Sequence, residues 1–123
     1  MIQANAIRLG VQPVAVIEAD ALDLILENKL PSALARPDRV LLGGGGRQRS
    51  RLLCAVLDRL QPGGVVVIPL ATLEALGELR PLLDRAGLMV RISQLQAWRG
   101  QPLGEGTRLM PMNPCIILSG TKK

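Results

Sequence analysis

The sequence predicts an α/β domain whose sheet is mostly parallel and ends in an antiparallel hairpin. Short apolar runs with the length of strands alternate with longer stretches whose apolar residues recur at helical spacing, and Gly and Pro separate them. One run, Val65–Leu70, is apolar throughout, which is typical of a parallel strand covered on both faces. A chain of 123 residues can bury one core, so we expect residues 1–123 to form a single domain.

The first half of the chain should contain two helices and two strands. Gly10 follows an apolar stripe and suits the left-handed residue that often ends a helix. Asp20 precedes a second stripe, where an acidic side chain can cap a helix. The expected elements are a helix over 1–9, a strand over 14–17, a helix over 21–30 and a strand over 39–42.

The second half should add two helices, three strands and a long loop. Thr72 can cap a helix in which Pro81 predicts a kink. Apolar residues change parity within 88–98, which a β-bulge near Ser93 and Gln94 would reconcile. Residues 99–114 are rich in Gly and Pro and predict a functional loop. The expected elements are a helix over 47–60, a strand over 65–70, a helix over 73–86, a strand over 88–98, the loop over 99–114 and a final antiparallel strand over 115–119.

The composition narrows the classes of function. A net charge of +5 and a pI near 10.2 favour an acidic partner. Aromatic residues make up only 1%, which argues against base stacking and therefore against nucleic acid. There is no His and no CxxC spacing around Cys54 or Cys115, so histidine bases and metal sites are not expected. No apolar run reaches the ~18 residues of a membrane span, and the expected location is the cytoplasm.

Four consecutive glycines mark the expected ligand site. Pro37–Gly46 reads PDRVLLGGGG, a strand that runs into a glycine loop and then a helix. Ligands of open α/β sheets bind beyond the carboxyl ends of the strands, and glycine lets backbone approach them closely. Arg47, Arg49 and Arg51 follow the loop. They could bind carboxylates through their guanidinium forks, or they could simply form a solvated helix face.

Five stretches carry a resemblance to a known family. They are NAIRLGV at 5–11, EADA at 18–21, PDRVLLGGGG at 37–46, LQPGG at 60–64 and RGQPLGEGTRLMPMNP at 99–114. The first four occur widely in S-adenosylmethionine-dependent methyltransferases, and the last is more specific. Together they resemble the methyl-transferring, carboxyl-terminal domain of the cobalamin-biosynthesis enzymes that methylate and decarboxylate precorrin-6Y, truncated at its amino end.

The resemblance implies a fold, a reaction and a set of site residues. The fold would be a partial Rossmann-like methyltransferase sheet, the latter two thirds of a class I methyltransferase domain. The reaction would be C-methylation of an acidic precorrin tetrapyrrole by S-adenosylmethionine, and no catalytic base is identified because alignment and the cofactor supply the reactivity. The implied residues are Asp20 and Ala21 at the adenine edge, Gly43, Gly44 and Gly45 near the methyl donor, and Arg99, Thr107 and Asn113 on the substrate side.

The resemblance also implies that parts of the family's domain have no counterpart here. These are the first strand with its glycine-rich cofactor loop and the second strand with its ribose-binding acid, which would lie between the strands over 14–17 and 39–42. We therefore expect weak or absent cofactor binding by this chain. The two flanking strands could pair directly, another chain could fill the gap, or the fold could be unstable alone.

Alternative interpretations remain open at this point. The chain could be a non-catalytic module that binds a tetrapyrrole or a partner and derives from a methyltransferase. Asp20 could be only a helix cap, and the glycines only a tight turn. The family forms oligomers, and unpaired strand edges encourage association, so a homo-oligomer is expected.

Overall fold

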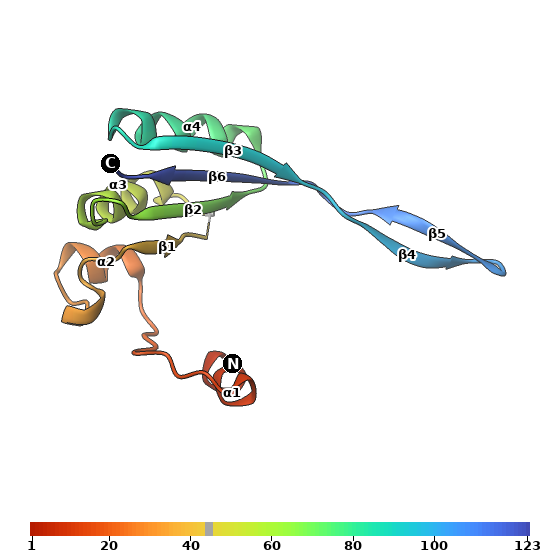
Figure 1. The fold of residues 1–123 in the computed structure, drawn as a ribbon, viewed down its shortest axis with the longest axis horizontal. Coiled ribbons are helices and arrows are strands. Elements are labelled where there is room, and N and C mark those ends of the chain that lie inside the picture. The colour runs from red at the N-terminus through yellow and green to blue at the C-terminus, as the bar shows by residue number, and fades with distance from the viewer. Residues whose placement is uncertain (44–45) are drawn as a thin grey trace.

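A computed structural model describes residues 1–43 and 46–123 (Figure 1). Its helices are α1 (Ile2–Leu9), α2 (Ala21–Leu26), α3 (Arg49–Arg59) and α4 (Leu73–Arg85), with a short 3-10 helix at Ser32–Leu34. Its strands are β1 (Arg39–Leu41), β2 (Val65–Leu70), β3 (Met89–Leu95), β4 (Trp98–Leu103), β5 (Gly106–Pro111) and β6 (Cys115–Thr121). Within these residues, each helix is too short or too polar to cross a membrane.

Four of the strands form a mixed sheet in the order β1-β2-β6-β3. β1 pairs with β2 in parallel, while β6 runs antiparallel to both β2 and β3. β1, β2 and β3 therefore point the same way and β6 points back, as the arrows in Figure 1 show. The predicted α/β fold with antiparallel final strands is confirmed.

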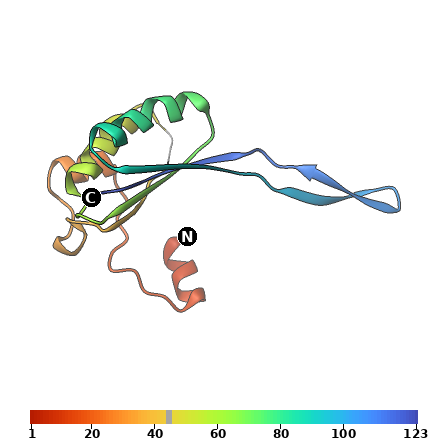
Figure 2. The ribbon, with the colours of Figure 1, turned by 45° about the horizontal axis from the view of Figure 1, so that its top comes forward.

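The hydrophobic core lies between one face of this sheet and helices α3 and α4, which cover the same side (Figure 2). Val66 and Ile68 of β2 are completely buried there. The other large side chains with full burial are Leu53, Leu60, Leu79, Leu83 and Leu118. Burial of each contributes roughly 1.5–3 kcal/mol relative to exposure. The expected strand over 65–70, with a helix before it and a helix after it in the chain, is confirmed, and it lies inside the sheet.

The other face of the sheet is open within the described residues. Val65 and Val67 are only half-buried, and Leu41 of the neighbouring strand is 77% exposed. The expectation of cover on both faces is therefore wrong, because β2 buries alternate side chains although the whole run is apolar. Helix α1 lies on this open side (Figure 2), but it makes no contact with any other described helix or strand.

Residues 11–20 join α1 to α2 without forming a strand. Val14 is 78% exposed, and Val16 and Ile17 are about two-fifths exposed. The expected strand over 14–17 is wrong because no backbone among the described residues satisfies its hydrogen-bonding groups, and a strand requires such a partner. Direct pairing of this segment with β1 does not occur, so the outer edge of β1 stays open among the described residues.

Helix ends follow the sequence signals with one exception. Gly10 adopts the left-handed conformation after α1, with φ of 68°, and the Thr72 hydroxyl accepts a hydrogen bond from the Ala75 amide at 3.1 Å. Helix α4 continues through Pro81. Helix α2 ends at Leu26 rather than near Leu30, because Asn28 turns the chain with φ of 53°.

β4 and β5 form a two-stranded hairpin, called the arm (residues 98–111), that extends well beyond the sheet (Figures 1 and 2). Its turn is Gly104–Glu105, with Gly104 at φ of 59°. The prediction of a long loop over 99–114 is therefore wrong, because the Gly and Pro residues obscured the strand pattern of β4 and β5. The bulge expected near Ser93 and Gln94 is wrong in its place, because β3 pairs with β6 without interruption to Leu95–Cys115. The register shifts by one residue just beyond this pair, since Trp98 pairs with Pro111.

Candidate functional site

A small cavity of about 290 Å³ lies where α2 and α3 begin. It is lined by Asp20, Ala21, Leu22, Gly46, Arg47, Gln48, Arg49 and Leu52. Gly46 and the arginines follow the carboxyl end of β1, the position at which an open α/β sheet binds its ligands. The cavity thus joins the EADA stretch to the end of the glycine loop, two features that lie far apart in the sequence.

Asp20 has a structural role at this cavity. Its Oδ1 accepts a hydrogen bond from the Asp23 amide at 3.1 Å and caps α2. This confirms the capping interpretation, and it leaves the second carboxylate oxygen without a partner in the described residues. Ala21, also in the cavity wall, has no side chain beyond Cβ. The two residues could therefore meet the edge of a flat ring.

The glycines are only partly described. Gly43 is exposed and has open space where a Cβ would be, while Gly44 and Gly45 lie outside the described residues. Gly46 adopts φ of 103°, a conformation that side chains rarely tolerate. Gly46 was not among the residues predicted for the site, although its place as the fourth glycine of the run was a usable signal.

Arg49 is held by an acid on the neighbouring helix. Its Nε and Nη2 donate to Glu78 Oε2 at 2.8 and 2.6 Å, and the Ser50 hydroxyl donates to Glu78 Oε1 at 2.5 Å. Hydrogen bonds from Arg49 and then Ser50 lower the pKa of Glu78 below its ordinary value. Arg49 is therefore an oriented cation at the cavity, and Glu78 is a neighbour that sequence spacing alone could not have identified.

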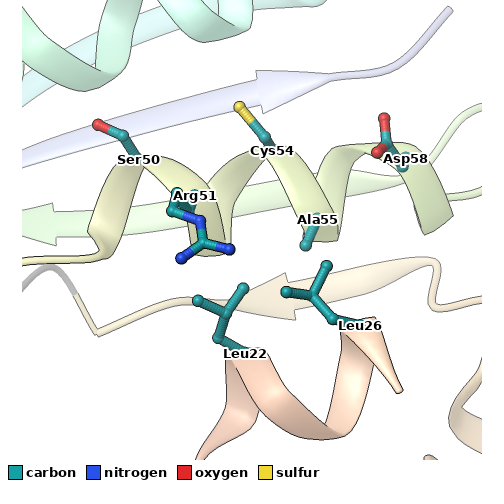
Figure 3. Close-up of a pocket in the computed structure, with 7 residues that line it drawn as sticks. All are labelled: Leu22, Leu26, Ser50, Arg51, Cys54, Ala55 and Asp58. Atoms are coloured by element: carbon teal, nitrogen blue, oxygen red, sulfur yellow. The ribbon is translucent and has the colours of Figure 1, made fainter. Parts of the chain in front are cut away.

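A second hollow, of about 310 Å³, lies between α2 and α3 (Figure 3). Leu22 and Leu26 project from α2 toward Arg51 and Ala55 on α3, as Figure 3 shows. Leu22 lines both hollows, so they are adjacent. Cys54 sits on the α3 side of the second hollow as a free, exposed thiol.

The arm leaves the body at the same end of the sheet as the glycine loop. β1, β2 and β3 all point toward this end, and the arm follows directly from β3 (Figure 1). Arg99, Thr107 and Asn113 are all exposed. The register separates them, since Thr107 pairs with Pro102 on one face of the arm while Arg99 pairs with Met110 on the other. Asn113 lies beyond the arm, between β5 and β6.

The fold is that of the S-adenosylmethionine-dependent methyltransferases. A solved O-methyltransferase of this kind from Thermotoga maritima matches 98% of the chain with a TM-score of 0.65, at 15% identity and over 44% of its own length. At that identity the likeness concerns the fold alone.

The sequence assigns the chain to a narrower group than the fold does. The precorrin methyltransferase domain matches residues 1–122, and the chain belongs to this family. A probable cobalt-precorrin-6B C(15)-methyltransferase (decarboxylating) from Pyrobaculum aerophilum is 40% identical over 116 residues, which cover 94% of this chain and 56% of that protein. The solved precorrin-6Y C5,15-methyltransferase from Geobacter metallireducens matches with a TM-score of 0.81 and 29% identity, over 98% of this chain and 61% of that one. The chain thus spans a little over half the length of these relatives.

Proposed function

We propose that the chain is the latter part of a C-methyltransferase that transfers a methyl group from S-adenosylmethionine to a precorrin tetrapyrrole in cobalamin biosynthesis. The observation that carries this proposal is the cavity that brings Asp20 and Ala21 next to Gly46 at the carboxyl end of β1. Family membership over residues 1–122 supports it. The proposal includes a cytoplasmic location and residues 1–123 as the latter two thirds of one domain.

The residues of this cavity fit one end of the cofactor. Asp20 has a free carboxylate oxygen and Ala21 a small side chain, which suits the edge of an adenine ring. At about 290 Å³ the cavity is at the lower limit of small-molecule sites. Asp20 is the only carboxylate among its described lining residues, so the ribose has no second acid. When bound, the cofactor supplies an electrophilic methyl group.

The chain's own residues would then hold the cofactor and the substrate in position and would not take part in the reaction themselves. Backbone at Gly43–Gly46 would lie near the methyl donor, and an oriented Arg49 would hold a negative group at the cavity. Methyl transfer to an electron-rich carbon depends on holding the two reacting atoms in line. No general base from this chain is required.

Titration of residues 1–123 with S-adenosylhomocysteine tests the cofactor part of the proposal. We expect weak or absent binding by these residues and clear binding by a polypeptide that adds the part of the Pyrobaculum relative that this chain does not match. Each missing charged hydrogen bond removes about 1.5–3 kcal/mol. Methylation of a precorrin by the extended form is the expected activity. An extended form that folds but neither binds the cofactor nor transfers methyl would overturn the proposal.

The second candidate is a binding module without chemistry. The small cavity and the single lining acid, already used as a helix cap, favour it for the chain taken alone. Tight binding of a tetrapyrrole by an extended form that lacks methyl transfer would support this candidate instead.

A further inference from the structure

The two faces of the arm differ in chemistry. One face carries Trp98, Gly100, Pro102, Thr107, Leu109 and Pro111, and the other carries Arg99, Gln101, Leu103, Gly106, Arg108 and Met110, as the pairing register requires. The contact that a Cβ at Gly100 would make with Thr107 Cγ2, at 3.3 Å, places those two residues on the same face. The first face is largely apolar, and both arginines of the arm lie on the second.

Arg99 and Arg108 are diagonal neighbours on this basic face. Arg99 pairs with Met110 and Arg108 pairs with Gln101, one diagonal step away. Diagonal partners in an antiparallel pair lie roughly 7–8 Å apart. Both arginines are exposed, and neither has an ion-pair or hydrogen-bond partner within residues 1–43 and 46–123. The only acid of the arm, Glu105, is in its turn.

We infer that Arg99 and Arg108 act together to bind two carboxylates of one flat, acidic ligand on the basic face of the arm, and that Arg108 is a specificity-determining residue. This inference rests on the proposed function, which supplies a tetrapyrrole with several carboxylates as the ligand. A guanidinium fork matches carboxylate geometry. Leu103 and Met110 on the same face offer apolar contact to a ring. The arm leaves the sheet at the end toward which β1 and β3 point (Figure 1), and the cavity lined by Gly46 follows β1.

The inference changes which residues belong to the substrate side. Thr107 faces away from Arg99, so one flat ligand on the basic face does not contact both. Arg108 therefore replaces Thr107 as the partner of Arg99. The spacing of the two guanidinium groups would select ligands by the arrangement of their carboxylates rather than by net charge.

Uroporphyrin, a porphyrin that carries carboxylates on every pyrrole ring, is a suitable probe for the full chain. Trp98 is the single tryptophan, so energy transfer from Trp98 to the bound porphyrin reports binding. We expect Arg99→Gln and Arg108→Gln each to weaken uroporphyrin binding about tenfold, because each removes a hydrogen bond between charged groups. The effects should shrink in high salt, which screens exposed charges.

Two controls separate this inference from simpler explanations. Arg85→Gln on α4 makes the same change of net charge away from the arm, and Thr107→Val alters the opposite face. Both should leave uroporphyrin affinity within about twofold. Circular dichroism and thermal unfolding should show all four variants folded, because these side chains are exposed.

Three results would overturn the inference. One is an equal loss of affinity in Arg85→Gln, which would indicate net charge alone. Another is a loss in Thr107→Val that matches the arginine variants, which would place the ligand on the other face. The third is displacement of uroporphyrin by heparin with the same dependence on Arg99 and Arg108, which would indicate a general anion surface. Cofactor binding and methyl transfer by the extended form are measured separately, so failure here is distinguishable from failure of the proposed function.

Discussion

Arg49 and Glu78 join the first turn of α3 to the middle of α4 through two hydrogen bonds to a single carboxylate oxygen, at 2.8 and 2.6 Å. The other oxygen of Glu78 accepts from Ser50. Both oxygens of the Glu78 carboxylate therefore accept hydrogen bonds within the protein. These bonds fix the side chain of Arg49 at the edge of the cavity. This pair leads to the first prediction.

The pH dependence of stability should change in Glu78→Gln. Bonds from Arg49 and Ser50 lower the pKa of Glu78 below its ordinary value of 4.5, so the folded state favours the charged form. The resulting stability is fully present above the ordinary pKa and is lost as the pH falls through the lowered one. Thermal unfolding between pH 7 and about pH 3 should show a shallower acid decline in Glu78→Gln. Asp84→Asn, which breaks the exposed Arg80 pair on the same helix, should follow the unmodified protein. An unchanged acid decline in Glu78→Gln would contradict the assignment.

Two glycine substitutions should have opposite effects on stability. Gly120→Ala places a Cβ 2.8 Å from Leu88 Cδ2 and 3.3 Å from Leu83 Cδ1, and overpacking of this kind costs about 1–3 kcal/mol. Gly77→Ala, inside α4 with nothing within 4 Å, should stabilise by about 0.5–1 kcal/mol. Chemical denaturation measures both. A neutral Gly120→Ala would mean that Leu88 and Leu83 do not pack as closely against β6 as described.

Substitutions at Asp20 should separate capping from ligand binding. Asp20→Ala removes the bond to the Asp23 amide and should cost about 1 kcal/mol, whereas Asp20→Asn keeps a capping oxygen and should cost little. In an extended form that binds S-adenosylhomocysteine, both variants should bind this ligand more weakly if the second carboxylate oxygen of Asp20 contacts adenine. Unweakened binding in Asp20→Asn would leave Asp20 with the structural role alone.

The apolar face of the arm should hold a second copy of the chain. We propose a homo-oligomer because Trp98 and Leu109 are 55% and 69% exposed on this face, and a two-stranded hairpin is marginally stable alone. Leu109→Glu should reduce the mass measured by light scattering, while Leu103→Glu on the basic face should not. A monomeric unmodified chain would contradict the proposal.

Local signals in the sequence predicted the elements that local chemistry determines. Gly10 and Thr72 mark helix ends whose geometry depends on one residue and its near neighbours. The apolar run at 65–70 predicted the central strand for the same reason. Pairing partners are different, because a strand depends on a neighbour elsewhere in the chain. Residues 14–17 have strand composition but no strand neighbour in the part of the chain that the structure describes. Residues 98–111 have loop composition but pair with each other.

The sequence predicted where the candidate site lies better than it predicted which residues contact each other there. Asp20 and Ala21 were identified through a motif, and they do line the cavity with Gly46. The Arg49–Glu78 contact joins residues on different helices, and no spacing rule relates them. The separation of Arg99 from Thr107 depends on the register of the arm. That register follows from the turn at Gly104–Glu105. The turn could not be recognised while residues 99–114 were interpreted as a loop.

Among the described residues, the arm is joined to the body only through neighbouring strands, since Leu95 and Cys115 are register partners at the last rung of the sheet. The hydrogen bond from the Met112 amide to the Ala97 carbonyl extends the ladder of the arm, whose register is shifted by one residue from that of β3 and β6. In the described part of the chain, the arm extends the β3–β6 hairpin, and its strands contact no other helix or strand. Replacing residues 97–113 with a tight turn would preserve every strand pairing of the sheet, and arms from related chains could be exchanged at the same junction. Ligand preference and assembly could thus diverge among relatives while the core remains unaltered.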